Sequence, residues 1–414
     1  MGKTGLDWTG LIPTKRLPSP GGGLLLLGRA YQQMGRLRLR AEEGEGQSVD
    51  RISDLPDTIL GDIVSRLPAK DGARTQVLSS RWRRIWRSAP LNLDLRSQPV
   101  PLGKVHRILS SHPGPGRCFS TPARYYNELH SHSRSRSAAI LDGWLRSRAL
   151  NNLQELDFRL DIPFRDRRNP PPLPASALRF SCTLRIARFW SCRFPDGISI
   201  RLPVLEELQL SHAIISDSES SLHALLAGCP ALQRLLLTYN DGCSRVRIAS
   251  PTLRSIDVGR GVGDLRLQQL IIEDAPCLER FHHHKAMSHH KMDICVMSAP
   301  KLGILGHIYD HYPRLEIGPT VFQTLSEGSE NVWGNNHNHI NIRLKKIVLR
   351  NYGANESHVN FVKFFVLNAR VIESIRLVLR FRNASNGWIE GRATVGLKNS
   401  SGRSRVTKGF LPHH

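Results

Sequence analysis

The chain is 414 residues long, and its contents of 40% hydrophobic and 22% charged residues are ordinary for a folded protein. Its 58 Lys and Arg outnumber its 35 Asp and Glu, and the formal net charge of +23 favours acidic partners, nucleic acid or anionic surfaces without indicating a fold. Because these charges are scattered, without a block of five or six of one sign, nucleic-acid binding is only a minor expectation.

Residues 1–49 are rich in Gly, Pro and Arg, and we expect them to form a disordered extension. The apolar run at 24–27 is too short for a secretion signal or a membrane span. The seven cysteines are odd in number and show no disulfide framework, which is typical of reduced thiols. We therefore expect a protein of the cytoplasm, the nucleus or both, without membrane contact.

Three short helices are predicted between residues 54 and 90. The apolar residues of the first share one helical face: Ile59, Leu60, Ile63, Val64 and Leu67. Pro56 suits its first turn and Pro68 ends it. The second helix fits 69–75, and Ser79 is a plausible N-cap for the third, which Pro90 closes. So small a unit cannot bury all its apolar side chains in itself, so we expect a partner helix to pack on it.

Residues 50–95 resemble an F-box, in the form that opens the large plant family of F-box proteins with leucine-rich repeats. The matching pieces are Asp50 to Ser53, Leu55 to Asp57, Ile59-Leu60, Leu67-Pro68, Lys70-Asp71, Arg74-Thr75, Val77 to Ser79 and Arg81 to Arg83. Gly72 departs from the family, which usually has Ala or a branched residue there. A helical glycine costs up to about 1 kcal/mol relative to alanine, so we expect it to loosen the module.

The resemblance implies that the module docks on a Skp-type adaptor, which holds the cullin and RING subunits of a ubiquitin ligase. Carried over by position, the adaptor-facing residues are Leu55, Pro56, Ile59, Leu60, Ile63, Leu67, Val77, Leu78 and Trp82. The alternative is that such side chains form the module's own core, which we prefer for Val64, Ile85 and Trp86. A helix-turn-helix is disfavoured because the third helix carries paired tryptophans, and its arginines are expected to be a solvated rim.

A leucine-rich repeat region is predicted over residues 96–340. Alternating leucines at 91–95 precede it, and its first part contains a loop region at 110–137 and a strand at 153–158. A P-x-L-x-x-L-x-L pattern then recurs from Pro203, Pro230, Pro251, Pro276 and Pro300, at intervals of 27, 21, 25 and 24 residues. The leucines should point into the stack, while the x positions face outwards on short parallel strands. The outward residues chosen as target-contact candidates are Glu207, Gln209, Arg234, Leu236, Ser255, Asp257 and Arg280.

Residues 341–381 resemble the start of the FBD domain that closes many members of the same plant family. After this segment, residues 382–414 are polar and rich in Gly and Ser. We therefore expect a truncated domain without its last strand, followed by a disordered tail.

Two sequence patterns resemble a metal site and a dinucleotide-binding site, and we interpret both as structural. The first combines His282, His283, His284, His289 and His290 with Cys277 and Cys295. Because no C-x-x-C pair is present, a polar insertion between repeats explains this segment more simply than a metal site does. The second is a group of glycines, Gly259, Gly261 and Gly263. A G-x-G-x-x-G dinucleotide fingerprint that starts at Gly259 would need its third glycine at position 264, where the chain has Asp264. No catalytic residue, metal or cofactor is therefore expected.

The predicted fold is α/β: a small three-helix F-box module followed by an irregular leucine-rich-repeat solenoid, or horseshoe. The predicted function is that of a non-catalytic, substrate-recognition subunit of an SCF-type ubiquitin ligase, which acts by holding an unidentified target protein close to the charged ubiquitin. The alternative is a leucine-rich-repeat protein outside any ligase that recognises a polyanion such as RNA. A third possibility is a ligase subunit made defective by Gly72 and the shortened end.

Overall fold

The computed structural model describes residues 52–121, 134–160, 169–195, 200–215, 219–259, 267–283, 292–309, 314–317, 320–323, 344–352, 362, 365–366, 371–382 and 388–396. The chain divides into two compact units, Met1–Asn92 and Leu93–His414. The predicted N-terminal extension lies outside the described residues. Among the described helices none has the length and apolar character needed to cross a bilayer.

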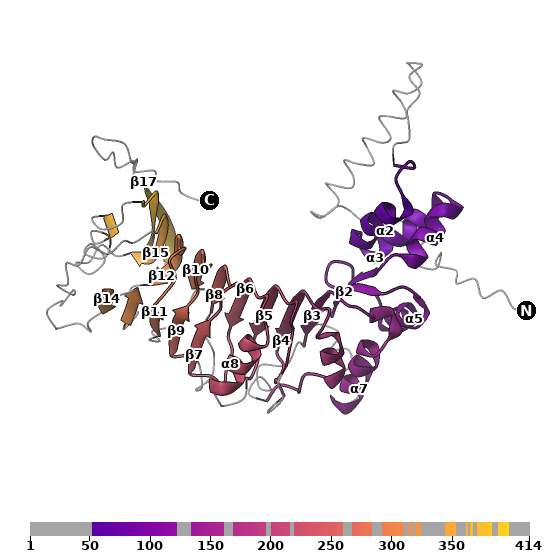
Figure 1. The fold of residues 1–414 in the computed structure, drawn as a ribbon, viewed down its shortest axis with the longest axis horizontal. Helices are drawn as coiled ribbons and strands as arrows, with labels where there is room; N and C mark the ends of the chain where they lie inside the picture. Colours follow the sequence, from indigo (N-terminus) through magenta and orange to yellow (C-terminus); the bar gives the residue numbers. More distant parts are fainter. Residues whose placement is uncertain are drawn as a thin grey trace, which may run out of the picture. The chain divides into compact units, whose positions relative to one another are not determined.

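Unit 1 contains the three predicted helices. They are α2 (Asp57–Arg66), α3 (Ala69–Arg74), continued by the 3-10 turn η2 (Thr75–Val77), and α4 (Ser80–Ser88), as shown in Figure 1. Leu67, before Pro68, is extended at φ −72° and ψ 146°, which ends α2. The Ser79 hydroxyl accepts a hydrogen bond from the Trp82 N–H, as its N-cap role predicts.

The core of unit 1 lies between α2 and α4. It is built from Leu60, Val64, Ile85, Trp86 and Ala89, with Leu55, Ala69, Ala73 and Trp82 packed partly against it. The core role predicted for Val64, Ile85 and Trp86 is confirmed.

Gly72 has a different role from the one that its helix propensity suggested. A Cβ atom there would lie 2.3 Å from Cζ3 and 2.9 Å from Cε3 of Trp86. Real Cβ atoms do not approach so closely, so the missing side chain is what allows the indole to lie against α3. The expectation that Gly72 only loosens the module is therefore corrected.

Unit 2 contains a sheet in which twelve strands are described, and their sheet order largely follows the sequence (Figure 1). In that order they are β1 (Leu91–Asp94), β2 (Gly116–Ser120), β3 (Glu155–Arg159), β4 (Ile186–Trp190), β5 (Glu207–Ser211), β6 (Arg234–Thr238), β8 (Ser255–Val258), β10 (Arg280–His283), β12 (Ile304–Tyr309), β15 (Lys346–Tyr352), β16 (Ser374–Arg382) and β17 (Trp388–Gly396). Each neighbouring pair from β2 to β16 is parallel. This arrangement confirms the predicted solenoid, although β2 occupies part of the expected loop region.

A second sheet accompanies the C-terminal half of the first. Its order is β14 (Thr320–Gln323), β13 (Arg314–Ile317), β11 (Asp293–Val296), β9 (Gln269–Asp274) and β7 (Arg245–Ala249). From β6 to β13, each repeat therefore adds one strand to each sheet. The helices described in unit 2 are α5 (Leu102–Ser111), α7 (Arg134–Leu145), the turns η3 (Arg148–Leu150) and η5 (Ala175–Phe180), and α8 (Glu219–Ala227).

One row of buried side chains runs through the repeats. The register aligns these residues strand by strand: Leu208, Leu235, Ile256, Phe281, Leu305, Ile347 and Ile375. Each is at most 1% exposed. Because side chains alternate along a strand, the residues on either side of this row belong to the opposite, polar face of the sheet, here called the strand face.

The C-terminal end of the sheet extends further than the sequence suggested. β17 runs from residue 388 to 396, inside the predicted disordered tail, and pairs antiparallel with β16 from Trp388↔Arg382 to Gly396↔Ser374. An edge strand leaves backbone N–H and C=O groups open to pairing, and β17 fills that place on β16. The expected loss of the last strand is corrected for residues 388–396, and residues 397–414 lie outside the described part of the chain.

Candidate functional site

Large apolar side chains lie exposed on the helices of unit 1 and the residues around them. Val77 is 79% exposed, Leu78 63%, Ile52 58%, Ile59 48% and Ile63 43%. We call these five residues the apolar surface. Single exposed apolar residues are common, but five of them within 27 residues of a small module indicate an interaction site.

The nine predicted adaptor-facing residues divide into three groups. Pro56, Ile59, Ile63, Val77 and Leu78 are exposed, and Leu55, Leu67 and Trp82 are half-buried. Leu60 is 0% exposed and belongs to the core, so its assignment to the contact surface is corrected.

The reason for the correction is that α2 presents apolar residues in two directions. Leu60 and Val64 are four residues apart and face α4, whereas Ile59 and Ile63 form a neighbouring stripe that stays in solvent. Ile52 was not predicted for the surface, although it lies in the matched piece Asp50 to Ser53.

Arg81 fixes the segment that leads into α2. Its Nε donates to Asp57 Oδ1 at 2.7 Å, Nη2 donates to the Leu55 carbonyl at 2.5 Å, and Nη1 donates to the Ser53 carbonyl. Three acceptors on one planar guanidinium hold this segment against α4. Arg81 is therefore a positioning residue, and the solvated-rim interpretation applies only to the exposed Arg83, Arg84 and Arg87.

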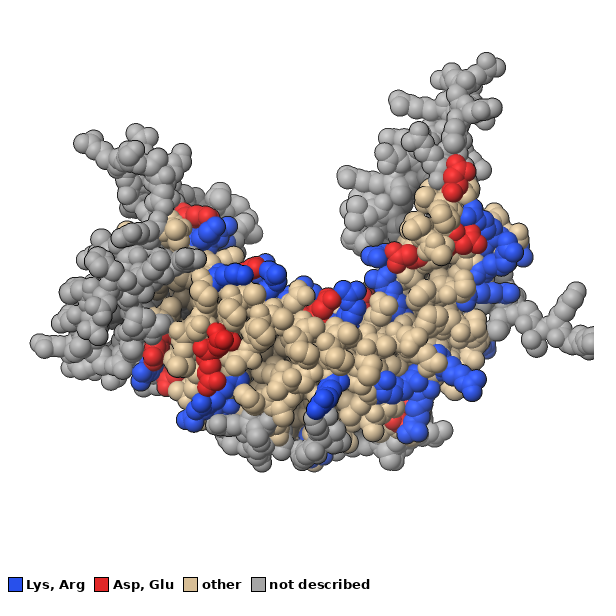
Figure 2. All heavy atoms as spheres, viewed as in Figure 1, with Lys and Arg blue, Asp and Glu red and all other residues tan. Residues whose placement is uncertain are grey.

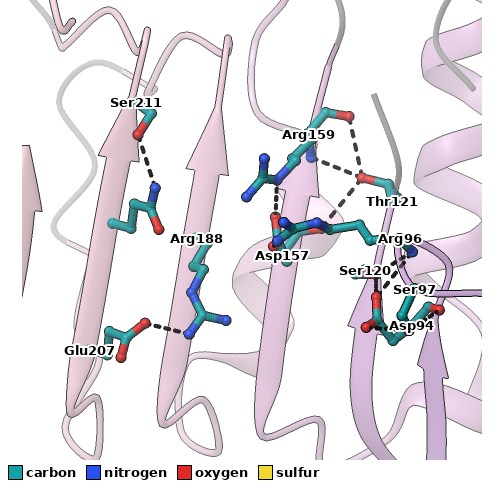
Figure 3. Close-up of polar contacts among 11 residues, drawn as sticks. Asp94, Arg96, Ser97, Ser120, Thr121, Asp157, Arg159, Arg188, Glu207 and Ser211 are labelled. Atoms are coloured by element: carbon teal, nitrogen blue, oxygen red, sulfur yellow. Dashed lines mark hydrogen bonds and ion pairs between the residues drawn. The ribbon is translucent and has the colours of Figure 1, made fainter. Parts of the chain in front are cut away.

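The strand face of unit 2 carries acidic side chains that are each held by two arginines. Arg96 Nη1 lies 2.6 Å from Asp157 Oδ2, and Arg159 Nε lies 2.9 Å from Asp157 Oδ1 (Figure 3). Glu207 is bound in the same way, by Arg188 at 2.5 Å and by Arg234 at 2.8 Å. These carboxylates are neutralised by their neighbours, so they offer little negative charge to a partner.

The register brings the predicted target-contact residues together in two rows. Glu207, Arg234, Ser255 and Arg280 are aligned on β5, β6, β8 and β10, and Gln209, Leu236 and Asp257 form the next row. Ser255 is only 6% exposed, because the longer Arg234 and Arg280 flank it on both neighbouring strands, and its assignment as a contact residue is corrected. The other six are half-buried or exposed, and their contact with a target stays a prediction.

Aromatic rings that sequence reasoning missed stack where β4, β5 and β6 end. His212 and Tyr239 are stacked with ring centroids 4.7 Å apart, and the Trp190 ring lies 6.1 Å from that of His212. The Arg159 guanidinium lies 4.0 Å above the Trp190 ring. His212 and Tyr239 have φ of 51° and 56° at equivalent repeat positions, which aims both rings the same way. The only feature of the sequence that could have predicted this stacking is the position of His212 and Tyr239 directly after a strand.

Burial raises the pKa of the Cys192 and Cys229 thiols to about 12, which disfavours the reactive thiolate. Within the described ranges no three His, Cys, Asp or Glu side chains are placed to hold a metal ion. His282 and His283 belong to β10, so the predicted His-rich loop 282–290 is corrected for these two residues, and His282 contacts Asp257 Oδ1 at 3.2 Å. Residues 284–290 and the glycines at 261 and 263 lie outside the described residues.

Comparison with known proteins gives matches to both units. Residues 52–94 match the F-box domain, and residues 141–333 match the leucine-rich repeats of FBD-associated F-box protein At5g56370. F-box/LRR-repeat protein At3g03360 of Arabidopsis thaliana is 27% identical over 293 residues, which cover 68% of this chain and 58% of the relative. F-box/FBD/LRR-repeat protein At2g04230 of the same plant is 29% identical over 232 residues, 52% of this chain and 48% of the relative.

A third relative, the putative F-box/FBD/LRR-repeat protein At2g05300 of Arabidopsis thaliana, is 28% identical over 211 residues, 49% of this chain and 45% of its own length. The chain thus spans about half the length of these relatives. The family-model matches end at residue 333, so the FBD-like interpretation of residues 341–381 stays a prediction from resemblance.

Proposed function

Since residues 52–94 match the F-box domain and residues 141–333 match the leucine-rich repeats of an FBD-associated F-box protein, we propose that this chain is the substrate-recognition subunit of an SCF-type ubiquitin ligase. In this proposal, unit 1 binds a Skp-type adaptor and, through it, the cullin and RING subunits. Unit 2 holds the target protein. The observation that carries the proposal is the apolar surface, which lies within the residues that match the F-box.

The apolar surface can supply much of the binding energy. Full burial of a Leu or Val side chain is worth about 1.5–3 kcal/mol. Val77 and Leu78 are 79% and 63% exposed, so most of that amount is still available when a partner covers them. Together they should contribute about 2–4 kcal/mol, which corresponds to roughly 30-fold to 1,000-fold in the dissociation constant.

The chain's own contribution to ubiquitin transfer is proximity. A target held on unit 2 has a high effective concentration near the ubiquitin-charged enzyme bound to the RING subunit. The lysine nucleophile comes from the target and the activated ubiquitin from that enzyme. No acid, base or nucleophile of this chain is required for the transfer.

Titration calorimetry of the full chain with a purified Skp-type adaptor tests the proposal. We expect tight binding by the wild type and at least about 30-fold weaker binding by the variant Val77→Ser with Leu78→Ser. The control is Met297→Ser, which removes a side chain of unit 2 that is 61% exposed. It should bind the adaptor like the wild type.

Two results would overturn the proposal: a wild type that does not bind the adaptor, or a double variant that binds equally well. If adaptor binding is absent while single-stranded RNA is bound with a steep dependence on salt, the polyanion alternative replaces it.

A further inference from the structure

The residues that directly precede the strands form a row of charged and polar side chains. In chain order they are Gln154, Arg185, Glu206, Gln233, Arg254, Glu279, Gly303, Lys345 and Glu373. The backbone N–H of each residue after Gln154 donates to the carbonyl of the previous one. We call them the entry row. Ion pairs join Arg185 to Glu206 at 2.6 Å, Arg254 to Glu279 at 2.6 Å and Lys345 to Glu373 at 3.8 Å.

Gly303 interrupts the entry row between Glu279 and Lys345. A Cβ atom at Gly303 would meet only the carbonyl oxygens of Lys301 and Glu279, at 3.8 and 3.9 Å. The space above the glycine is therefore open and could accept a side chain without a clash. Nothing in the local packing demands glycine here, in contrast to Gly72.

A cleft of about 520 Å³ opens at this interruption. It is lined by Glu279, Arg280, Pro300, Lys301, Gly303, Ile304, Lys345, Lys346 and Glu373. Its volume lies within the range of roughly 300–1,000 Å³ that is typical of ligand pockets. All lining residues belong to unit 2, so the cleft is separate from the apolar surface.

The charge of the cleft is unbalanced in favour of cations. Its two carboxylates are already occupied, Glu279 by Arg254 and Glu373 by Lys345. Arg280 and Lys346, by contrast, form no ion pair within the described part of the chain. The register Arg280↔Ile304↔Lys346 places them on the two strands that flank β12, one on each side of Ile304, the residue that follows Gly303.

We propose that this cleft receives an acidic segment of the target protein, with carboxylates paired to Arg280 and Lys346. The inference rests on the proposed function, because it assigns the class of target that unit 2 holds. Pro300 and Ile304 supply an apolar part of the lining between the cations, which suits a peptide whose acidic residues alternate with apolar ones.

Figure 2 is consistent with a local rather than a general attraction. Over the visible face of unit 2, acidic and basic side chains lie in separate small groups between neutral areas, and the basic side chains do not form one continuous band. A polyanion that binds through net charge needs such a band, whereas an acidic segment needs only a few unpaired cations within one cleft.

Fluorescence anisotropy of the full chain with a short labelled peptide of alternating glutamate and leucine tests the proposal. We expect saturable binding that is lost when every glutamate of the peptide is replaced by glutamine. Arg280→Glu and Lys346→Glu should each weaken binding about tenfold, because each reverses a charge next to a carboxylate.

Matched variants separate the cleft from the overall charge and from folding. Gly303→Leu fills the cleft and should abolish binding, whereas Gly303→Ala adds one methyl group to open space and should bind within about twofold of the wild type. Arg107→Glu changes the net charge equally at an exposed site of α5, away from the cleft lining, and should also stay within about twofold.

Several results would overturn the inference: no peptide binding, equal binding of the glutamine peptide, or an Arg107→Glu effect as large as that of Lys346→Glu. Tighter binding of oligouridine, weakened by the same cleft variants, would assign the cleft to nucleic acid instead. Adaptor titration of the same variants distinguishes the two proposals, because substitutions in unit 2 should leave adaptor binding unchanged if the proposed function holds.

Discussion

Gly72→Ala should destabilise unit 1, although alanine is the better helix former. The new Cβ would lie 2.3 Å from Trp86 Cζ3, and Trp86 is only 3% exposed, so the indole would have to move by more than an ångström inside a packed core. Overpacking of this kind costs about 1–3 kcal/mol, and the gain in helix propensity offsets up to about 1 kcal/mol. We expect a net loss of about 1 kcal/mol, and at most about 2 kcal/mol if alanine gains the full helix propensity.

Hydrogen exchange followed by mass spectrometry measures this loss locally, in peptides that cover α2, α3 and α4, without requiring two-state unfolding of the whole chain. A double-mutant cycle with Trp86→Leu identifies the cause. With the indole removed, Ala at position 72 should be neutral or stabilising relative to Trp86→Leu alone. An equal destabilisation in both backgrounds, or none in the wild type, would refute the reasoning.

Three further predictions concern other buried or bonded groups. Arg81→Met should speed hydrogen exchange in the segment around Leu55 and weaken adaptor binding, whereas an unchanged exchange rate would contradict the positioning role. Burial lowers the pKa of His112 below 6.5, because the charged imidazole is disfavoured inside the folded protein. The neutral imidazole therefore contributes fully to stability above about pH 6.5, and this contribution is lost as the pH falls towards the pKa of His112 in the folded protein. The melting temperature of the wild type should therefore fall more between about pH 7.5 and pH 5.5 than that of His112→Asn, and equal losses would contradict this. Burial raises the pKa of Cys192 to about 12, so iodoacetamide should alkylate it at least about 100-fold more slowly than the exposed Cys182, and similar rates would contradict this.

The helices of unit 1 and the parallel strands of unit 2 could be predicted because local signals determine them. Pro68 and the Ser79 cap set the limits of helices, and the recurring Pro and Leu set the strands, wherever the chain lies in space. The wrong predictions concern residues whose burial depends on a neighbouring element. Leu60 is buried because α4 covers it, and Ser255 because longer side chains stand on both sides.

Other features depend on contacts between distant repeats and could not be predicted from local patterns. The stacking of His212 on Tyr239 joins residues whose spacing has no periodic meaning outside the solenoid. The cleft exists because Gly303 occupies a row in which neighbouring repeats carry charged or polar side chains, and this row forms only when the repeats stack. β17 was missed because the polar composition of its surroundings concealed a strand that pairs with an open edge.

The most direct test of the central claim is assembly. Size-exclusion chromatography with light scattering would be applied to the full chain mixed with a purified Skp-type adaptor, a cullin and a RING subunit. We expect one complex that contains all four proteins, and the loss of this chain alone from the complex when Val77 and Leu78 are replaced by serine. Elution of the wild-type chain apart from an intact adaptor–cullin–RING complex would contradict the account.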